Sequence, residues 1–250
     1  MIWKHFLAAA LAATMFTTSA GASVTITTTG NSATDGTDGN IRTFTNGGIT
    51  VQASGWSYDG NTLERAFLGA YSSGLGVTNN SEGNGQTNSN HTADNVGQSD
   101  FILLIFNQAV NIASATLIPF DVSPDPNDND AWVSYATLAG AFTNPATPLT
   151  TGSSVWTTLN NNDWNVSGNM TSPYGTSLNS AGLFGNVWII GSSRPNLDSN
   201  DDGFKLKSIV VTPGAVPEPS TWAMMLLGFG AVGAALRRSR KLGERVPQIA

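Results

Sequence analysis

The middle of the chain consists of short apolar segments separated by loops rich in Asn and Gly, and this pattern restricts the fold more than any other feature. Segments 24–28, 41–45 and 49–53 alternate apolar and polar residues, as strands with one buried face do. Asn46-Gly47-Gly48 predicts a hairpin turn between the last two. Segment 101–106 (FILLIF) is apolar throughout and predicts a strand buried on both faces. Further strands are expected at 61–71, which also fits a short helix, and at 110–117, 131–138, 155–159, 187–190 and 204–212.

Nine or ten short strands linked by turns predict an all-β fold, an antiparallel β-sandwich of jelly-roll type. The composition agrees, because 11% of the 250 residues are charged while 27 are Gly, a balance found in turn-rich β proteins. A chain of this length can bury a core without disulfides. It has no Cys, which excludes a Cys nucleophile and thiolate metal sites.

The N-terminus has the three parts of a secretory signal peptide: Lys4, an apolar stretch at 6–16, and small residues at Ala20 and Ala22. We expect cleavage after Ala22, with Ala20 as the second choice, and export through the Sec translocon followed by signal peptidase. A buried N-terminal helix is the alternative interpretation. The predicted domains are therefore a signal peptide at 1–22 and a β-sandwich ectodomain at 23–215.

Residues 216–241 read VPEPSTWAMMLLGFGAVGAALRRSRK. The uncharged run 222–236 would form a helix about 22 Å long, which is short for a hydrocarbon core about 30 Å thick. Pro217 and Pro219 favour an extended, accessible segment before this helix. The basic cluster after it favours a cytoplasmic location for the tail, 242–250. The pattern predicts a short transmembrane helix in transient contact with the inner membrane.

Two classes of nucleotide ligand are disfavoured. Gly228, Gly230 and Gly233 match G-x-G-x-x-G, but a dinucleotide site also needs a preceding strand, a βαβ unit and a later acidic residue, which the sequence lacks here. Residues 23–215 hold five basic and fifteen acidic residues, a net charge of about −10. That charge argues against nucleic-acid binding, because phosphate contacts need a basic face.

The segment 216–241 resembles the PEP-CTERM sorting signal of Gram-negative envelope proteins. The resemblance implies recognition by exosortase, a membrane transpeptidase-like enzyme that cuts near Pro-Glu-Pro and passes the protein to the cell surface. The tail 242–250 departs from the family, whose chains usually end soon after the basic cluster. By this resemblance the sorting motif is Val216, Pro217, Glu218 and Pro219, and the helix and its stop are Trp222, Leu236, Arg237, Arg238, Arg240 and Lys241.

Segment 74–106 is similar to a pattern in a subset of these proteins, the exosortase-dependent surface protein group, and 201–211 resembles the last strand of that group. This resemblance implies no catalytic activity. The matching residues are Gly74, Leu75, Gly76, Val77, Asn79, His91, Asp94, Asn95, Asp100 and Phe101.

An acidic loop at 198–203 (DSNDDG) matches the first half of an EF-hand calcium loop, with Asp198, Asn200 and Asp202 as alternating oxygen ligands. Its twelfth position is Ile209 instead of the bidentate Glu, so a complete EF-hand is excluded. The sequence leaves open a calcium-binding β loop, an acidic turn without a cation, and participation of a second acidic stretch at 125–130. No cofactor is required, and calcium is the candidate ligand.

Three further residues are candidates for ligand contacts. His91 is the one histidine of the predicted mature chain and lies near Asp94. It is compatible with a loop histidine bonded to local backbone, with a metal site shared with Asp94, or with a hydrolase that lacks the G-x-S-x-G elbow. Trp164, between Asn and Asp residues, is the tryptophan most expected to be exposed for stacking on a sugar, whereas Trp132 and Trp188 are expected in the core.

The combined interpretation is an exported, non-enzymatic cell-surface or extracellular-matrix protein that exosortase processes and that associates with exopolysaccharide or biofilm. A carbohydrate-binding β-sandwich is the first alternative, and a secreted hydrolase is the second.

Overall fold

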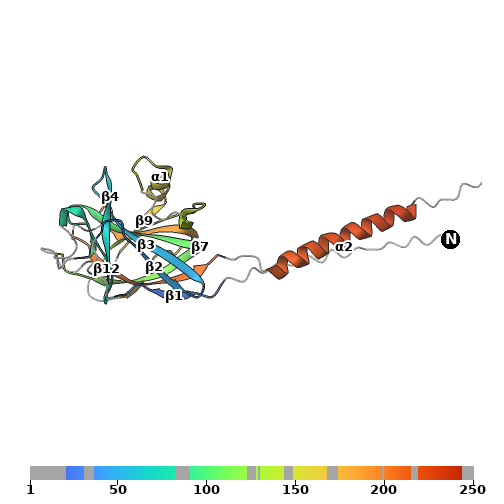
Figure 1. Ribbon diagram of the computed structural model, residues 1–250, viewed down its shortest axis with the longest axis horizontal. Helices are drawn as coiled ribbons and strands as arrows, with labels where there is room; N and C mark the ends of the chain where they lie inside the picture. The colour runs from blue at the N-terminus through green and yellow to red at the C-terminus, as the bar shows by residue number, and fades with distance from the viewer. Residues whose placement is uncertain are drawn as a thin grey trace, which may run out of the picture. The chain divides into compact units, whose positions relative to one another are not determined.

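The computed structural model describes residues 21–30, 37–82, 91–122, 128, 130–143, 149–167, 174–196, 198, 200–214 and 219–243. A β domain, Ala20–Gly214, and a unit that contains helix α2, Pro219–Gly243, are separate, and each is described by itself (Figure 1). The expected signal peptide lies outside the described residues except for Gly21 and Ala22, which precede the first strand in an irregular segment.

The described part of the β domain forms one sheet of twelve strands, so the mostly β class is confirmed. A single α-helix, α1 (Ser154–Asn161), and two 3-10 turns, η1 (Asn80–Glu82) and η2 (Ala141–Thr143), accompany them. The strands are β1 (Val24–Thr27), β2 (Ile41–Asn46), β3 (Ile49–Tyr58), β4 (Leu63–Tyr71), β5 (Gly74–Thr78), β6 (Ala93–Asp94), β7 (Ser99–Pro119), β8 (Ala131–Ala136), β9 (Asp163–Val166), β10 (Tyr174–Ser177), β11 (Gly185–Ser192) and β12 (Gly203–Pro213).

Strand β7 organises the sheet. It runs for 21 residues, where the sequence analysis expected two separate strands. Its first half pairs with β3 and β11, so that Trp56 lies opposite Phe101. Its second half pairs with β12 and β10, so that Ile209 lies opposite Ala115. One strand therefore connects two sets of neighbours.

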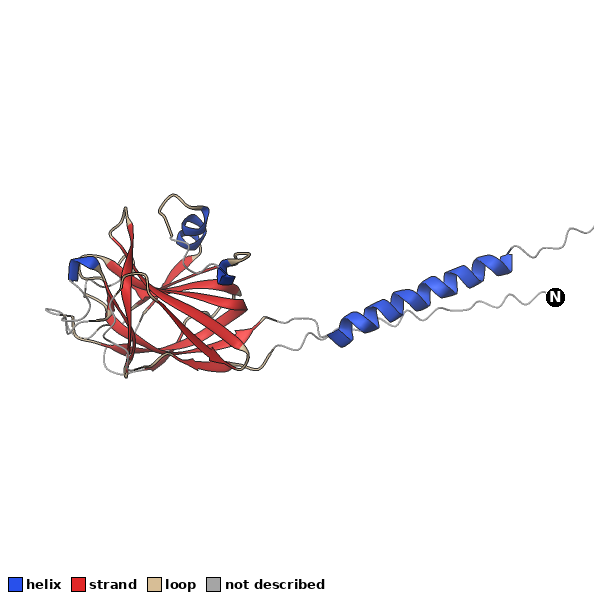
Figure 2. Cartoon of the chain, in the orientation of Figure 1, coloured by secondary structure: helices blue, strands red, loops and turns tan. Residues whose placement is uncertain are grey.

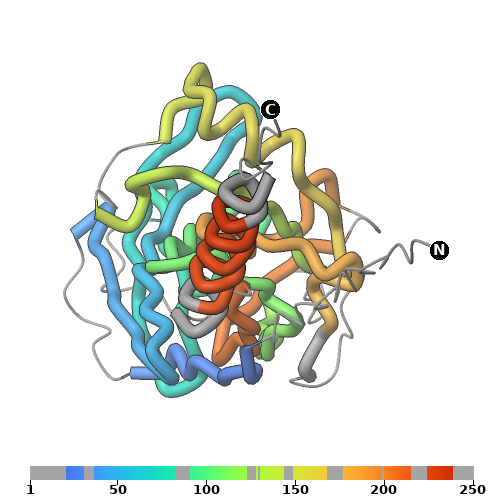
Figure 3. The backbone as a smooth tube through the Cα atoms, turned by 90° about the vertical axis from the view of Figure 1, so that its right-hand side faces the viewer, coloured from blue at the N-terminus to red at the C-terminus, as the bar shows by residue number. Residues whose placement is uncertain are grey.

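The ladder of strands returns on itself through β12. The order is β1-β12-β5-β4-β3-β7-β11-β8-β9, and β12 pairs a second time with β7. The strands therefore curve around a common interior (Figure 2). Hairpin β2–β3 runs beside β4 at one side of this arrangement (Figure 3). Its predicted turn is present, and Gly47 and Gly48 have φ values of 56° and 79°, a conformation that favours glycine.

The apolar segment 101–106 lies between two hydrophobic clusters. Its even-numbered side chains belong to the larger cluster, which includes Trp188 and Phe204 and fills the interior of the β domain. Its odd-numbered side chains belong to a second cluster on the opposite face, which includes Trp132 and residues of α1. Burial of this strand on both faces is as predicted from its continuous apolar sequence.

Helix α1 corrects the strand predicted at 155–159. The β-branched residues there favour a strand, but the Ser153 hydroxyl accepts a hydrogen bond from the Trp156 N–H (3.2 Å) and so caps a helix. Trp156 and Leu159 lie on one helical face, and both are buried in the second cluster. Burial of this face outweighs the local strand propensity, since tertiary packing supplies most of the stability of a short helix.

Helix α2 spans 25 residues, which is longer than the predicted run 222–236. Its described apolar side chains are exposed, and Leu226 is 72% accessible. Within the described residues, no helix combines the length and the apolar character needed to cross a membrane. The predicted transmembrane character of this segment is therefore not confirmed. Residues 216–218 and 244–250 lie outside the described residues.

Candidate metal centre and sorting segment

The two acidic loops of the sequence come together in the fold. Asp130 and Asp202 are 72 residues apart, and each directly precedes a strand, β8 and β12 respectively. The Asp130 N–H donates a hydrogen bond to Asp202 Oδ1 (3.1 Å), and the Gly203 N–H donates to the Asp128 carbonyl (2.9 Å). The Ser193 N–H, just after β11, donates to the Asp130 carbonyl (3.2 Å). Backbone hydrogen bonds therefore hold the starts of two strands and the end of a third beside one another.

This arrangement gathers three buried carboxyl groups. One carboxylate oxygen from each of Asp128, Asp130 and Asp202 lies within 4.8 Å of the other two. The three residues are 2%, 5% and 0% exposed. Carboxylate oxygens are the ligands that Ca²⁺ prefers, so the group has the chemistry of a hard-cation site. Asp128 and Asp130 come from the acidic stretch that the sequence analysis ranked second to the loop at 198–203.

Asp202 is the central member of this group. Its Oδ2 accepts hydrogen bonds from the Asn95 side chain (2.7 Å), from the Ser193 N–H (3.2 Å) and from the Ser193 hydroxyl. Burial is the main cause that raises the pKa of Asp202 to about 7, and the charges of Asp128 and Asp130 raise it further while the Ser193 bonds oppose them. The donors to Asp202 named above are neutral, so a bound cation would stabilise its ionised form.

The other two predicted calcium ligands, Asp198 and Asn200, are hydrogen-bonded to each other. Asp198 is exposed, and its carboxylate accepts hydrogen bonds from the Asn200 N–H (3.0 Å) and side-chain amide (2.9 Å). These two bonds are the main causes that lower the pKa of Asp198. A side-chain hydrogen bond links Asp198 to Asp128, which places Asp198 at the rim of the buried group. The loop therefore supplies one buried carboxyl instead of the predicted alternating set.

His91 lies against Thr78 and Tyr71. Its Nδ1 is 2.9 Å from the Thr78 hydroxyl, and its ring stacks on Tyr71 with the centroids 5.3 Å apart. Burial, and secondarily the charge of Lys205, lower the pKa of His91. These contacts are those of a histidine packed between strands.

Asp94 points to different partners. It is 1% exposed, and its two oxygens accept hydrogen bonds from the Thr92 hydroxyl (2.9 Å) and the Val96 N–H (3.1 Å). In the described part of the chain the hydrogen bonds of His91 and Asp94 do not join the two residues. The structure therefore does not bring them together as the pair considered from the sequence.

Close backbone contacts explain the two glycines of the Gly-Leu-Gly stretch in β5. A Cβ on Gly76 would lie 1.9 Å from the His91 carbonyl oxygen. A Cβ on Gly74, whose φ is +130°, would lie 2.4 Å from the Leu206 carbonyl oxygen. The pattern beginning at Gly74 is therefore required by packing, because β5 approaches two other backbones closely.

Trp164 is not the exposed ring that its polar neighbours in the sequence suggested. It is half-buried against the larger cluster, edge-to-face with Trp188 at a centroid distance of 6.4 Å, and its Nε1–H donates to the Leu178 carbonyl (2.8 Å). Trp132 and Trp188 are fully buried, as predicted. Alternation along β9 turns Trp164 toward the core, which its Asn- and Asp-rich surroundings do not reveal.

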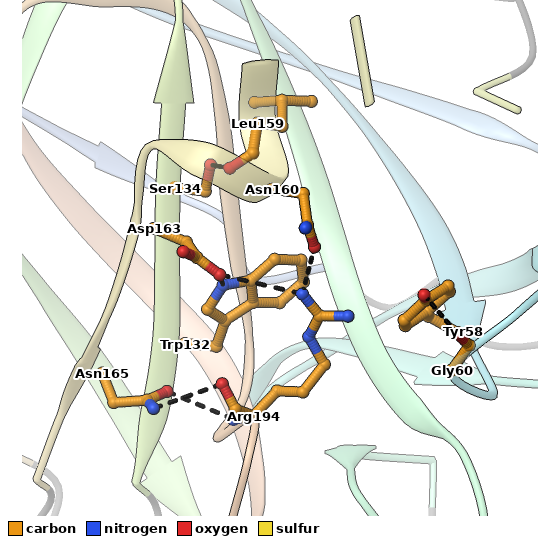
Figure 4. A network of polar contacts seen from close by, with 9 residues as sticks. All are labelled: Tyr58, Gly60, Trp132, Ser134, Leu159, Asn160, Asp163, Asn165 and Arg194. Atoms are coloured by element: carbon orange, nitrogen blue, oxygen red, sulfur yellow. Dashed lines mark hydrogen bonds and ion pairs between the residues drawn. The ribbon is translucent and has the colours of Figure 1, made fainter. Parts of the chain in front are cut away.

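Sequence reasoning gave no role to Arg194, which lies among aromatic rings. Its guanidinium lies 4.6 Å from the Trp132 ring centroid and 4.7 Å from that of Tyr58. It forms an ion pair with Asp163 (3.7 Å), and Asp163 also accepts from the Trp132 Nε1–H (2.9 Å) (Figure 4). The same arginine borders an open cavity of about 350 Å³, lined by Tyr58, Asp59, Gly60, Asn95, Gly97, Ser99 and Arg194.

The C-terminal unit matches a known sequence family. Residues 215–241 match the family model described as the PEP-CTERM protein-sorting motif. This chain carries a PEP-CTERM sorting signal. The signal marks it as an exported protein that exosortase processes and directs to the cell surface. Comparison with curated proteins and with solved structures returns no match.

Within the PEP-CTERM segment, α2 begins at Pro219, so the proline occupies the first turn, where its missing N–H costs no helical hydrogen bond. Trp222, Arg240 and Lys241 belong to the same helix. The side chains of Leu236, Arg237 and Arg238 are exposed. Val216, Pro217 and Glu218 lie outside the described residues.

Proposed function

We propose that the β domain, 23–215, acts as a non-enzymatic protein of the cell surface or extracellular matrix of a Gram-negative bacterium, associated with exopolysaccharide. The observation that carries this proposal is the PEP-CTERM motif at 215–241, because it directs the chain to the surface. In this scheme the Sec translocon exports the chain, signal peptidase removes 1–22, and exosortase cuts near Pro-Glu-Pro after a transient contact with the inner membrane. The acidic, cysteine-free β domain is then the mature protein.

Mass analysis of the C-terminus tests the processing step. We expect the surface fraction of cells with exosortase to contain a chain that ends near Pro-Glu-Pro, whereas cells without exosortase retain α2 in the membrane fraction. A variant with Glu218→Ala should behave like the exosortase deletion, and Glu244→Ala, beyond the motif, serves as its control. Retention of residues 222–250 by the mature protein in both strains would show that the segment is not a sorting signal.

A carbohydrate-binding module is the second candidate, and the cavity beside Arg194 favours it. Tyr58 and Arg194 offer planar groups, and Asp59 and Asn95 offer polar ones, which are the groups that stack on and hydrogen-bond to a sugar ring. Trp156 packs 5.0 Å from Tyr58, so binding should change tryptophan fluorescence. Titration with the organism's own polysaccharide should give a signal that Tyr58→Ala abolishes, with half-buried Tyr135→Phe as the control. If no fraction of that polysaccharide changes the tryptophan fluorescence, the β domain is not a carbohydrate-binding module of this kind.

A secreted hydrolase has less support. The ring of His91 contacts Thr78 and Tyr71, and Asp94 faces other carboxyl groups, so the expected acid does not orient the imidazole. A hydrolase centred on His91 would lose its activity in His91→Ala, whereas a packing role predicts a change in stability alone.

A further inference from the structure

A second group of carboxyls lies near the start of β7, separate from the one that includes Asp202. Glu82 follows β5 on η1, Asp94 ends β6, and Asp100 is the second residue of β7. One carboxylate oxygen from each lies within 4.8 Å of the other two. Asp94 is 1% exposed and Asp100 is fully buried. The fold therefore holds two buried acids, Asp94 and Asp100, together with half-buried Glu82.

Asp94 and Asp100 lie next to other acidic groups. Burial, and then the charge of Glu82, raise the pKa of Asp94 to about 7, and burial and the charges of Asp94 and Glu82 raise that of Asp100. Among the described residues, every charged group that shifts these two pKa values is itself acidic. Asp94 accepts from the Thr92 hydroxyl and the Val96 N–H, Asp100 accepts from the Asn79 amide, and a hydrogen bond links the side chains of Glu82 and Asp94. Buried charge of one sign requires either bound protons or a cation.

Among the described residues, no hydrogen-bond partner reaches two buried oxygens, one in the group and one beside it. Asp100 Oδ1 accepts from the Asn79 amide (3.0 Å), but Asp100 Oδ2 has no partner within the described structure. Ser57, on β3, lies directly opposite Asp100, is fully buried, and has an unpartnered hydroxyl. Opposite residues of antiparallel strands share a face, with Cβ atoms roughly 5 Å apart. Because an unsatisfied buried polar group is unfavourable, two of them on one face indicate a ligand that binds oxygen.

We propose that Glu82, Asp94 and Asp100 bind one Ca²⁺ ion. Oxygens bound to the same Ca²⁺ at about 2.4 Å lie at most about 4.8 Å apart, so the spacing of the three carboxylates admits this ion. The second Asp100 oxygen supplies a lone pair that no donor of the described residues uses. Ca²⁺ tolerates irregular sets of oxygen ligands, whereas Mg²⁺ demands a near-ideal octahedron. The site shares no carboxylate with the group around Asp202, and the proposal does not depend on exopolysaccharide binding.

Equilibrium dialysis of the full chain against radioactive Ca²⁺, after treatment with EDTA, tests the proposal. The wild type is expected to bind Ca²⁺ at about 1 mM, the range of extracellular calcium modules. Asp100→Asn keeps the shape but removes a charge, and it should lose one bound Ca²⁺ or bind it at least about tenfold more weakly. Glu82→Gln, at a half-buried position on η1, should do the same with less risk to folding. Asp38→Asn, in an exposed turn, makes the same charge change and should bind as the wild type does.

The thermal midpoint gives an independent measurement on the same proteins. Ca²⁺ should raise the midpoint of the wild type and of Asp38→Asn, and it should raise those of Asp100→Asn and Glu82→Gln by less. The proposal is wrong if the wild type binds no Ca²⁺ at 1 mM. It is also wrong if both Asp100→Asn and Glu82→Gln retain full binding while Asp202→Asn loses it, because the ion then belongs to the other group.

Discussion

Replacing Gly76 with Ala tests the contact between β5 and the segment that begins at His91. The added Cβ would lie 1.9 Å from the His91 carbonyl oxygen, whereas real Cβ contacts closer than 3.0 Å are essentially never observed. The two backbones must therefore separate by about 1 Å, and no flexible side chain can absorb the clash. We expect the free energy of unfolding to fall by more than about 3 kcal/mol, at the upper end of overpacking effects.

Denaturant titration of the full chain measures this loss, with Gly152→Ala as the matched control. A Cβ on Gly152 has no heavy atom within 4 Å, and its φ is not positive, so this variant should stay within about 0.5 kcal/mol of the wild type. Displacing the His91 segment would also move Asp94, so Gly76→Ala should weaken Ca²⁺ binding. A Gly76→Ala protein as stable as Gly152→Ala would refute the close contact on which this reasoning depends.

Three further measurements follow from the structure. Ser153→Ala removes the cap of α1 and should cost about 1 kcal/mol in a denaturant titration, whereas exposed Thr157→Ala should cost less. Arg194→Met removes a partly buried cation that contacts the Trp132 ring and Asp163, so the thermal midpoint of the protein should fall. Arg194→Lys keeps the charge but not the planar group, and it should not restore the midpoint fully. An unchanged midpoint in both variants would show that these contacts contribute little to stability. NMR titration should place the pKa of His91 below its ordinary value of about 6.5. Because the unfolded chain then binds the proton more readily, this residue's contribution to stability is present above about pH 6.5 and is lost as the pH falls through the folded-state value; a pKa at or above 6.5 would contradict its burial.

The spacing of apolar residues along the sequence predicted most of the strands that line the core of the β domain. Segment 101–106 reads as a doubly buried strand because all its residues are apolar, and it is one. The pattern could not show that this strand continues to Pro119, because the polar residues between its halves resemble a turn. It also predicted a strand where α1 forms, because the propensity of residues 155–159 does not reflect the hydrophobic cluster into which Trp156 packs. Strands β5, β6, β9 and β10 are short or Gly-rich and have little periodicity to detect.

The candidate sites were predicted less completely than the strands. Asp202 and Asp94 were identified from local motifs, and the stretch 125–130 was noted as acidic. Glu82 carries no local signal that joins it to Asp94, and Asp128 was identified only as a member of that acidic stretch. Their grouping depends on pairings between distant segments, such as Gly203 with Asp94 and β3 with β7. Sequence proximity therefore identified members of each group but not its full composition.

The sequence by itself determined the destination of this protein and the class of its fold. A sorting enzyme reads a short contiguous segment, so residues 215–241 carry that information without any tertiary structure. Strand periodicity is also local, because neighbouring side chains alternate between faces. Only the tertiary structure decided which acids face one another, since Asp130 and Asp202 meet across 72 residues, and Glu82 on η1 meets Asp94 and Asp100 only because β6 and β7 pass beside it. Burial by those same strands raises the pKa values of Asp94 and Asp100, and it leaves one Asp100 oxygen without a donor among the described residues.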